Sequence, residues 1–343
     1  MNAQCIMHNA QYLLLKVLCI RAWKSFLLSA KQLCIVHCAL CIMLAGCHHQ
    51  ELCEHHPHSG IVRVVFDWEN APDVHPPHMQ VWFYPTDGSQ HTPFQLVGRD
   101  GGVVNIPAGE YNIICLDGSH ENISYRGQDS FDGFEIFTRP TTLLSPMQRV
   151  ASNVPVAGGT EDQTVITEPD PVYGHSLTRV TIEDNVPVTI TMYPEPLTCT
   201  YEVIIRNVEN LARAEQLSAS MSGVAPMLHV SSVGLRGEPS IMPFSVTRVD
   251  DTTVSGKFLA FGHWPTDEMR HPVVVYAVME DGAQRYQVFD DEDGSISMQI
   301  DTSPDPHYVK IELEDLNLPE TSSGGGMGVA VSDWGSEVFD ITL

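Results

Sequence analysis

The first 46 residues contain no aspartate or glutamate, although acidic residues dominate the rest of the chain, beginning with Glu51. Their four basic residues are Lys16, Arg21, Lys24 and Lys31. This leader also lacks an apolar run of the ~20 residues that a membrane-spanning helix needs, because its last apolar stretch covers only residues 33–44. A basic, acid-free segment that ends in a short apolar core is typical of a signal peptide.

The apolar stretch ends in Leu-Ala-Gly-Cys, and histidines follow Cys47 at once. These four residues match the bacterial lipobox, in which the cysteine is acylated and becomes the new N-terminus after cleavage. We therefore predict a lipoprotein signal peptide over residues 1–46, lipidation of Cys47, and membrane attachment through that lipid. The alternative is a buried helix that ends by chance in the same residues, although such a helix would be unusually free of acids.

Basic residues are scarce after the leader. Of 18 lysines and arginines, 14 lie beyond residue 46, against 43 acidic residues, which gives residues 47–343 a formal charge of −29. A surface of this charge repels nucleic acid and anionic lipid headgroups. We therefore exclude nucleic acid as a partner, and we expect the lipid rather than the protein surface to hold the chain at a membrane.

Cysteines are too few after the leader for a disulfide framework. Five of the nine lie before Cys47, which the lipid would occupy, so that Cys53, Cys115 and Cys199 remain. An odd, widely spaced set does not define a pairing, although an oxidising envelope would permit one bridge. Cys115 and Cys199 lie in strand patterns, where a small buried hydrophobic residue is the favoured interpretation.

Residues 47–58 form a histidine-rich tether that could attract metal ions. Its candidate ligands are His48, His49, Cys53, His55, His56 and His58. Neutral imidazole and thiolate suit zinc or copper. However, a flexible tether offers no surrounding residues to orient the ligands, so we predict adventitious binding, no built metal site and no cofactor.

Motifs for catalysis are also lacking. The chain contains no HExxH, no GxSxG and no glycine-rich phosphate loop after a strand, so we predict no enzymatic activity. The acidic stretch Asp290 to Gly294 resembles a calcium loop, but Phe289 stands where that pattern requires an acid. We predict a hairpin turn there, between Val288 and Ile296.

Alternation with a period of two dominates the chain after the tether. Val62, Val64 and Phe66 share one face of a stretch whose other face carries Arg63 and Asp67, as in a half-buried strand. Similar strand-like stretches are residues 79–85, 101–118, 186–194, 200–208, 271–282, 284–294, 295–300, 308–316 and 336–343. Only residues 210–217 have a helical composition. Many short strands with Gly, Pro and Asp turns predict an all-β chain of β-sandwiches.

We predict two tandem β-sandwich domains, an N-terminal one over residues 59–193 and a C-terminal one over residues 197–343. The junction lies in Met-Tyr-Pro-Glu-Pro-Leu-Thr, residues 192–198, where two prolines separate strand patterns. Residues 144–176 are rich in Pro, Gly, Thr and Asp with little periodicity, and we expect a surface excursion.

Several stretches resemble a family of uncharacterised Bacteroidales lipoproteins related to fimbrillins and to fimbrial anchor and minor subunits. They are the lipobox, "VRVVFDWENAP", "VWFYPTDG", "GRDGGVVNIPAGEYNIICLDG", "ENISYRGQDSFDGFEIFTR" and "AEQLSASMSGVA". The resemblance implies two transthyretin-like, fimbrillin-like sandwiches, a lipid anchor in the cell outer membrane, and a non-enzymatic role in building or attaching surface fibres for adhesion. It implies no catalytic residue.

The resemblance also suggests how such a chain engages fimbrial subunits, namely by adding an extended strand to an open sheet edge. Fimbrillins are believed to lose their first strand by cleavage after an arginine, and Arg63 is the corresponding candidate protease site. A solvent-facing charge on a half-buried strand is the more frequent role for such a residue. The C-terminal alternation of Phe339, Ile341 and Leu343 fits a donated strand or, more often, the last strand of its own sandwich.

A surface lipoprotein that binds glycans or another ligand is the alternative function. It would use exposed aromatic residues such as Trp82, Trp264 or Trp334, gathered on one shallow platform. Core packing is the more frequent role for each of these tryptophans. The arrangement of their rings therefore distinguishes the two functions.

Overall fold

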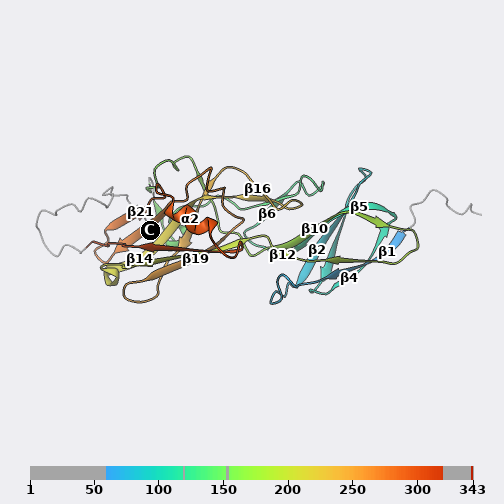
Figure 1. Cartoon of the computed structure of the whole chain (residues 1–343), viewed down its shortest axis with the longest axis horizontal. Helices are drawn as coiled ribbons and strands as arrows, with labels where there is room; N and C mark the ends of the chain where they lie inside the picture. The colour runs from blue at the N-terminus through green and yellow to red at the C-terminus, as the bar shows by residue number, and fades with distance from the viewer. Residues whose placement is uncertain (1–58, 119, 152–153, 320–340, 343) are drawn as a thin grey trace, which may run out of the picture. The chain divides into compact units, whose positions relative to one another are not determined.

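The described chain is built almost entirely from β-strands, as the computed structural model in Figure 1 shows. The structure describes residues 59–118, 120–151, 154–319 and 341–342, all of which fall in one compact unit, His58–Leu343. The all-β class expected from the alternation is therefore confirmed.

Two sheets form the first stack. Their strands are β1 (Ser59–Phe66), β2 (His78–Pro85), β3 (Thr92–Val97), β4 (Gly101–Pro107), β5 (Gly109–Asp117), β10 (Tyr173–Ile182), β11 (Val188–Met192) and β12 (Glu195–Pro196). One sheet has the order β11-β1-β4 and the other the order β12-β10-β5-β2-β3. Alternate residues such as Val62, Phe83 and Ile113 are fully buried in one core cluster. The Tyr111 hydroxyl donates to the Pro107 carbonyl over 2.9 Å and fixes the turn between β4 and β5.

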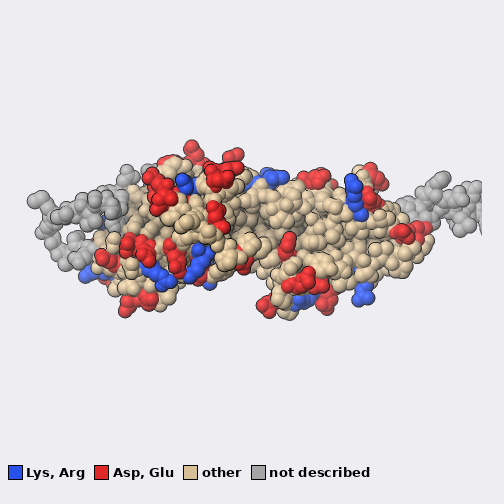
Figure 2. Space-filling view, viewed as in Figure 1, with Lys and Arg blue, Asp and Glu red and all other residues tan. Residues whose placement is uncertain are grey.

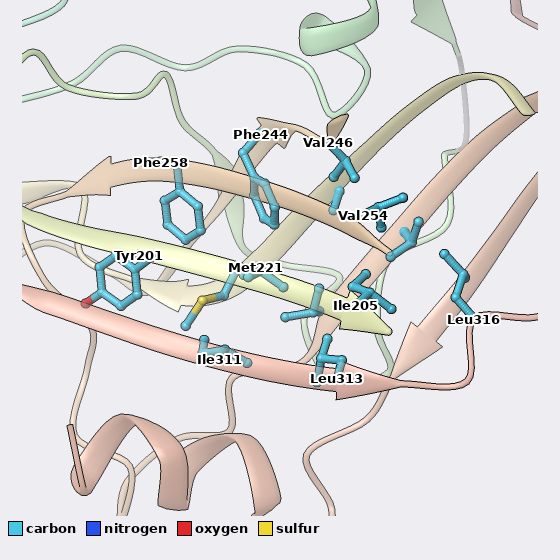
Figure 3. Close-up of a cluster of buried hydrophobic side chains, with 14 of the residues drawn as sticks. Tyr201, Ile205, Met221, Phe244, Val246, Val254, Phe258, Ile311, Leu313 and Leu316 are labelled. Atoms are coloured by element: carbon cyan, nitrogen blue, oxygen red, sulfur yellow. The ribbon is translucent and has the colours of Figure 1, made fainter. Parts of the chain in front are cut away.

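Two further sheets form the second stack. Their strands are β9 (Thr164–Val165), β13 (Cys199–Arg206), β14 (Ala214–Val224), β17 (Ser240–Ser245), β18 (Thr247–Arg248), β19 (Val254–Ala260), β20 (Val273–Met279), β21 (Gln284–Phe289) and β22 (Tyr308–Glu314). The orders are β18-β19-β13-β22 and β21-β20-β14-β17-β9. Figure 3 shows their shared core, in which the Phe258 ring stacks on those of Tyr201 and Phe244 at 5.0 and 4.7 Å. Two short helices accompany the strands, the 3-10 helix η2 (Leu211–Arg213) and the α-helix α2 (Ser295–Asp301).

A small four-stranded sheet joins segments that are far apart in the sequence. Its strands are β6 (Ser124–Arg126), β7 (Glu135–Phe137), β15 (Met227–His229) and β16 (Gly234–Arg236), in the order β16-β15-β7-β6. Because β7 pairs with β15, the chain before residue 193 is hydrogen-bonded to the chain after residue 197. Beneath this sheet, Trp82 and Ile114 of the first stack share a core cluster with Phe134 and Leu228.

Residues 138–151 and 154–170, here together called the clasp, leave the first stack and pack on the second. The clasp contains the 3-10 helix η1 (Ser145–Met147) and β8 (Val150–Ala151), which pairs with β23 (Ile341–Thr342). Its strand β9 pairs in parallel with β17 at the sheet edge. Leu144 and Met147 pack against Val274 and Tyr276 of β20, and the Tyr276 hydroxyl donates to the Pro155 carbonyl over 2.7 Å. The described part of the expected excursion is thus bound to the second stack up to residue 170, whereas its last residues, from Tyr173, belong to β10 of the first stack.

The helix expected over residues 210–217 is wrong. Only Leu211–Arg213 form one short 3-10 turn, and β14 begins at Ala214. The composition of this segment favours a helix, but β14 pairs with both β17 and β20. Pairing with two neighbouring strands and burial stabilise β14 by more than the helix propensity of its residues, which is a few tenths of a kcal/mol per residue.

The strand expected over residues 295–300, and the hairpin turn before it, are also wrong, because residues 295–301 form α2. The Asp291 carboxylate is fully buried and accepts the backbone N–H groups of Ile296 and Ser297 over 2.9 and 3.1 Å. Unpaired N–H groups at the start of a helix need such an acceptor. Ile296 and Ile300 then share the buried face one helical turn apart.

The domain limits of 59–193 and 197–343 remain a prediction. β12 still pairs with β10 of the first stack, and β13 of the second stack begins at Cys199. However, the small sheet takes strands from both sides of the proposed junction, and β9 joins the second stack. The sheets therefore do not divide in strict chain order.

Acidic side chains are spread over the face that Figure 2 shows, whereas lysine and arginine are fewer. After residue 46 the sequence has two lysines, Lys257 and Lys310, both on the four-stranded sheet of the second stack. Lys257 Nζ lies 3.2 Å from Glu202 Oε1, and Lys310 Nζ lies 2.6 Å from Glu312 Oε1. Both positive charges are therefore already paired.

Candidate functional site

The predicted lipid and the described fold meet at β1. Cys47 lies outside the described residues, twelve positions before Ser59, where β1 begins. β1 is the middle strand of its sheet, with β4 antiparallel on one side and β11 parallel on the other. Val62, Val64 and Phe66 are buried in the core. A pull on the predicted anchor would therefore act directly on a central strand.

Close packing fixes the position of β1. A side chain at Gly60 would meet Ile182 at 2.5 Å, and one at Gly101, where φ is +98°, would meet the Val64 carbonyl at 2.1 Å. These approaches are possible only because glycine has no Cβ. Gly60 therefore leaves room for the Ile182 side chain, and Gly101 lets the backbone of β4 approach that of β1.

Arg63, the candidate protease site, points to solvent from the middle of β1. Its neighbours across the sheet are Val103 of β4 and Thr189 of β11. This position matches the alternative role of a solvent-facing charge on a half-buried strand. The backbone at Arg63 is paired on both sides, so cleavage after Arg63 would require β1 to leave the sheet first. Cleavage at Arg63 remains a prediction.

The described part of the C-terminal stretch forms a small sheet of its own. Ile341 pairs with Ala151 and Thr342 with Val150, in antiparallel orientation, and Phe339 and Leu343 lie outside the described residues. β23 therefore contacts the clasp and is not a member of either sheet of the second stack. Its donation to another subunit remains a prediction.

Of the three tryptophans considered for a glycan platform, the structure describes Trp82 and Trp264. Trp82 is 4% exposed, and its ring packs edge-on against Phe134 at 5.0 Å. Trp264 is half-buried, and Trp334 lies outside the described residues. The Trp82 ring therefore cannot face a ligand, as the core-packing alternative expects.

Metal and thiol chemistry have little support in the described ranges. His48, His49, Cys53, His55, His56 and His58 lie outside them. Among the residues that the structure describes, no group of three or more His, Cys, Asp or Glu could hold a metal ion, and no helix is long and apolar enough to cross a membrane. Cys115 is fully buried, and burial, together with Asp305, raises the pKa of Cys199 to about 11, so neither free thiol is a reactive thiolate.

Sequence reasoning missed a buried histidine pair in the second stack. The Tyr201 hydroxyl and His263 Nδ1 are 2.7 Å apart, and the His263 and His271 rings lie 5.5 Å apart. His271 is fully buried and donates from Nδ1 to the Ser222 carbonyl. The pKa of His263 is lowered to about 4, chiefly by burial and also by the charge of His271, while Asp301 opposes the shift. Burial also lowers the pKa of His271, against the charges of Asp291 and Asp301.

This pair should make the second stack sensitive to mild acid. The unfolded histidine binds its proton near pH 6.5, whereas folded His263 stays neutral down to about pH 4, so stability falls as the pH drops through that window. After allowance for partial exposure, His263→Gln should remove on the order of 1 kcal/mol of the loss between pH 7 and pH 5. Urea unfolding at both pH values would measure it. His307→Gln, at an exposed position, is the control, and an equal effect of both changes would contradict the assignment.

Comparison with known proteins places the chain in a family. A family model described as "Domain of unknown function (DUF5119)" matches residues 46–245, more than half of the chain. The chain belongs to the DUF5119 family. This DUF5119 chain is 30% identical over 97 residues to a Bacteroides ovatus protein described as "Putative fimbrium anchoring subunit Fim4B". That match covers 28% of this chain and 29% of the relative, so it spans less than a third of either protein.

The fold of the DUF5119 chain has a counterpart among solved structures. A crystal structure of a "putative adhesin" from Bacteroides ovatus matches 80% of this chain and 98% of its own, with a TM-score of 0.58 and 20% identity. At this identity the likeness establishes the fold alone. It extends over most of the chain and thus covers more than the 97 residues aligned with the fimbrial relative.

Proposed function

We propose that this DUF5119 chain is a non-enzymatic fimbrial anchor or accessory subunit that acts in adhesion and is held in the outer membrane by lipid on Cys47. The observation that carries the proposal is the 30% identity over 97 residues to the relative described as "Putative fimbrium anchoring subunit Fim4B". The family match begins at residue 46, just before the lipobox cysteine. The adhesin-like fold supports it. The lipid supplies the membrane attachment that a surface of charge −29 cannot supply.

The position of β1 favours an anchor that keeps its first strand. Cleavage after Arg63 would release the lipidated N-terminal piece and open a gap between β4 and β11. Apolar side chains such as Val104, Ile106 and Ile190 line the core there. A subunit cleaved in this way would accept a strand from a neighbour but would lose its lipid. An anchor must keep β1 in place. Cleavage after Arg63 would therefore take place only when the protein is released from the membrane.

Other sheet edges are partly closed against strand addition. On β22, the Gln299 side chain donates to the Glu312 carbonyl over 3.1 Å and accepts the Glu312 N–H over 2.7 Å, as a neighbouring strand would. On β3, Pro93 has no N–H to offer. A fimbrial subunit that binds by strand addition would therefore have to displace a strand that is already present. β23 is the candidate for displacement, because only two of its residues pair with β8.

Binding to fimbrial subunits tests the proposal. The Cys47→Ser chain without its leader would be incubated with subunits from the same gene neighbourhood at low and high salt. Because strand addition relies on backbone pairing and apolar side chains, we expect slow dissociation that hardly changes with salt, and a changed association rate. A peptide that copies the partner's terminal strand should compete. Failure of every subunit to bind, together with glycan-array hits that are lost on Trp264→Ala, would favour the glycan-binding alternative.

A further inference from the structure

Each stack contains a parallel pair in which an early strand lies beside a late one. In the first stack, β1 pairs with β11 over five register positions, from Val62 with Val188 to Phe66 with Met192. In the second stack, β13 pairs with β22 over seven positions, from Thr200 with Tyr308 to Arg206 with Glu314. Most other ladders of these stacks are antiparallel. In each of these two pairs, the start of the early strand and the end of the late strand therefore lie at opposite ends of the ladder.

This geometry decides how a ladder responds to tension. If a load pulls the start of one strand away from the end of its parallel neighbour, the force runs along the strands and stretches every hydrogen bond of the ladder together. If the load instead separates two adjacent ends, the bonds break one after another. The first case has the higher barrier, and forced unfolding is governed by that barrier rather than by equilibrium stability.

We propose that the β1–β11 and β13–β22 pairs are shear clamps that let the chain carry tension between its N-terminal attachment and a partner that holds residues beyond Glu314. The inference rests on the proposed function only for the source of the load. A lipid on Cys47 would pull on the start of β1, and the end of β11 leads through β12 to the start of β13. The small sheet and the clasp also join the two stacks, so each clamp is loaded within its own stack.

The surroundings of β1 strengthen the first clamp. β1 is also paired with β4 over seven positions, from Ser59 with Pro107 to Val65 with Gly101. Sliding β1 along its axis would break both ladders and would draw Val62 and Val64 out of the core. Exposing two buried valines adds about 1.5–3 kcal/mol each to the work of extraction. The clamp thus combines hydrogen bonds with buried apolar surface.

Side chains tie the second clamp on its solvent face. The Tyr308 hydroxyl of β22 donates to the Glu202 carboxylate of β13, and Lys257 of β19 lies 3.2 Å from the same carboxylate. Arg206 of β13 lies 3.2 Å from Glu312 of β22. Such exposed pairs add little to equilibrium stability. Under shear they must break together with the ladder, so their effect should appear in the rupture force and hardly at all in the melting temperature.

Single-molecule pulling with two attachment geometries tests the first clamp. Handles would be coupled through azide-bearing residues placed in the otherwise unchanged mature chain, residues 47–343 with Cys47→Ser. Attachment at positions 59 and 193 loads β1 against the far end of β11, whereas attachment at positions 59 and 186 loads the adjacent ends. We expect an unfolding force at least about two-fold higher in the first geometry. Equal forces, or a higher force in the second geometry, would overturn the proposal.

The second clamp has its own matched pair of geometries. Attachment at positions 200 and 314 shears β13 against β22, and attachment at positions 200 and 307 unzips them. Tyr308→Phe removes one tie and should lower only the shearing force. An unchanged shearing force would refute the role of that tie. The measurement needs no fimbrial subunit, so its failure would leave the proposed function intact, and failure of subunit binding would leave the clamps intact.

Discussion

Replacing Cys47 with serine is expected to leave the chain as an uncleaved precursor that does not reach the outer membrane as a lipoprotein. The thiol of Cys47 is the acceptor of the lipid in the predicted lipobox, and no other residue of Leu-Ala-Gly-Cys can take its place. Without acylation the signal peptidase that acts on lipoproteins has no substrate. Labelling cells with an alkyne fatty acid, followed by fractionation and immunoblotting, would show both the lost label and the larger precursor.

Cys53→Ser is the matched control for this experiment. Cys53 lies six residues further on, in the same histidine-rich tether, and is also a thiol that could be acylated. We expect this variant to be cleaved, labelled and retained like the unchanged chain. If the Cys47 variant were processed and membrane-bound in the same way, the lipoprotein interpretation would be wrong.

Replacing Asp291 with alanine should destabilise the folded chain by about 3 kcal/mol. The buried carboxylate accepts the N–H groups of His271, Ile296 and Ser297 and the hydroxyl of Ser297, and thus links the start of β20 to the start of α2. Alanine would leave these donors without an acceptor in a site that water does not reach. Thermal and urea unfolding would measure the loss.

Asp290→Ala is the control for the Asp291 change. Asp290 is the adjacent acid of the same sequence, but its side chain is exposed. We expect its removal to change stability by less than about 0.5 kcal/mol. Similar losses for both variants would show that Asp291 does not hold β20 and α2 together.

The sequence predicts the strands well where one face is buried. β1, β13 and β22 alternate between core and solvent, as the period of two of a half-buried strand requires. The turn between β4 and β5 also follows from local residues, because Pro107 and Gly109 meet the backbone requirements of a tight turn. Local information is sufficient for these elements.

Local sequence does not predict the structure of segments whose conformation depends on contacts with distant residues. Residues 295–300 alternate like a strand, yet Asp291 supplies the acceptor that starts a helix, and only the folded chain brings His271 to the same carboxylate. The packing of the clasp on β20 joins residues more than a hundred positions apart, as in the bond from Tyr276 to Pro155. The residue pattern of a single segment cannot predict such a long-range contact.

The sequence predicts only part of the candidate site at Arg63 and β1. The alternation around Arg63 indicates which way its side chain points, and the structure confirms that Arg63 faces solvent. The alternation does not reveal that β1 lies between β4 and β11, because pairing partners depend on the path of the whole chain. The parallel pairing with β11, from which the clamp is inferred, therefore required the structure.

Intact-mass analysis of fibres released from cells by mild detergent would decide whether the chain is a lipid-anchored part of a fibre. The proposed function predicts that the chain co-purifies with the fibre subunits in small amounts and that its mature N-terminus is an acylated Cys47. Fibres that lack the chain, or that contain it with an unlipidated N-terminus at Val64 after cleavage at Arg63, would contradict an anchoring role.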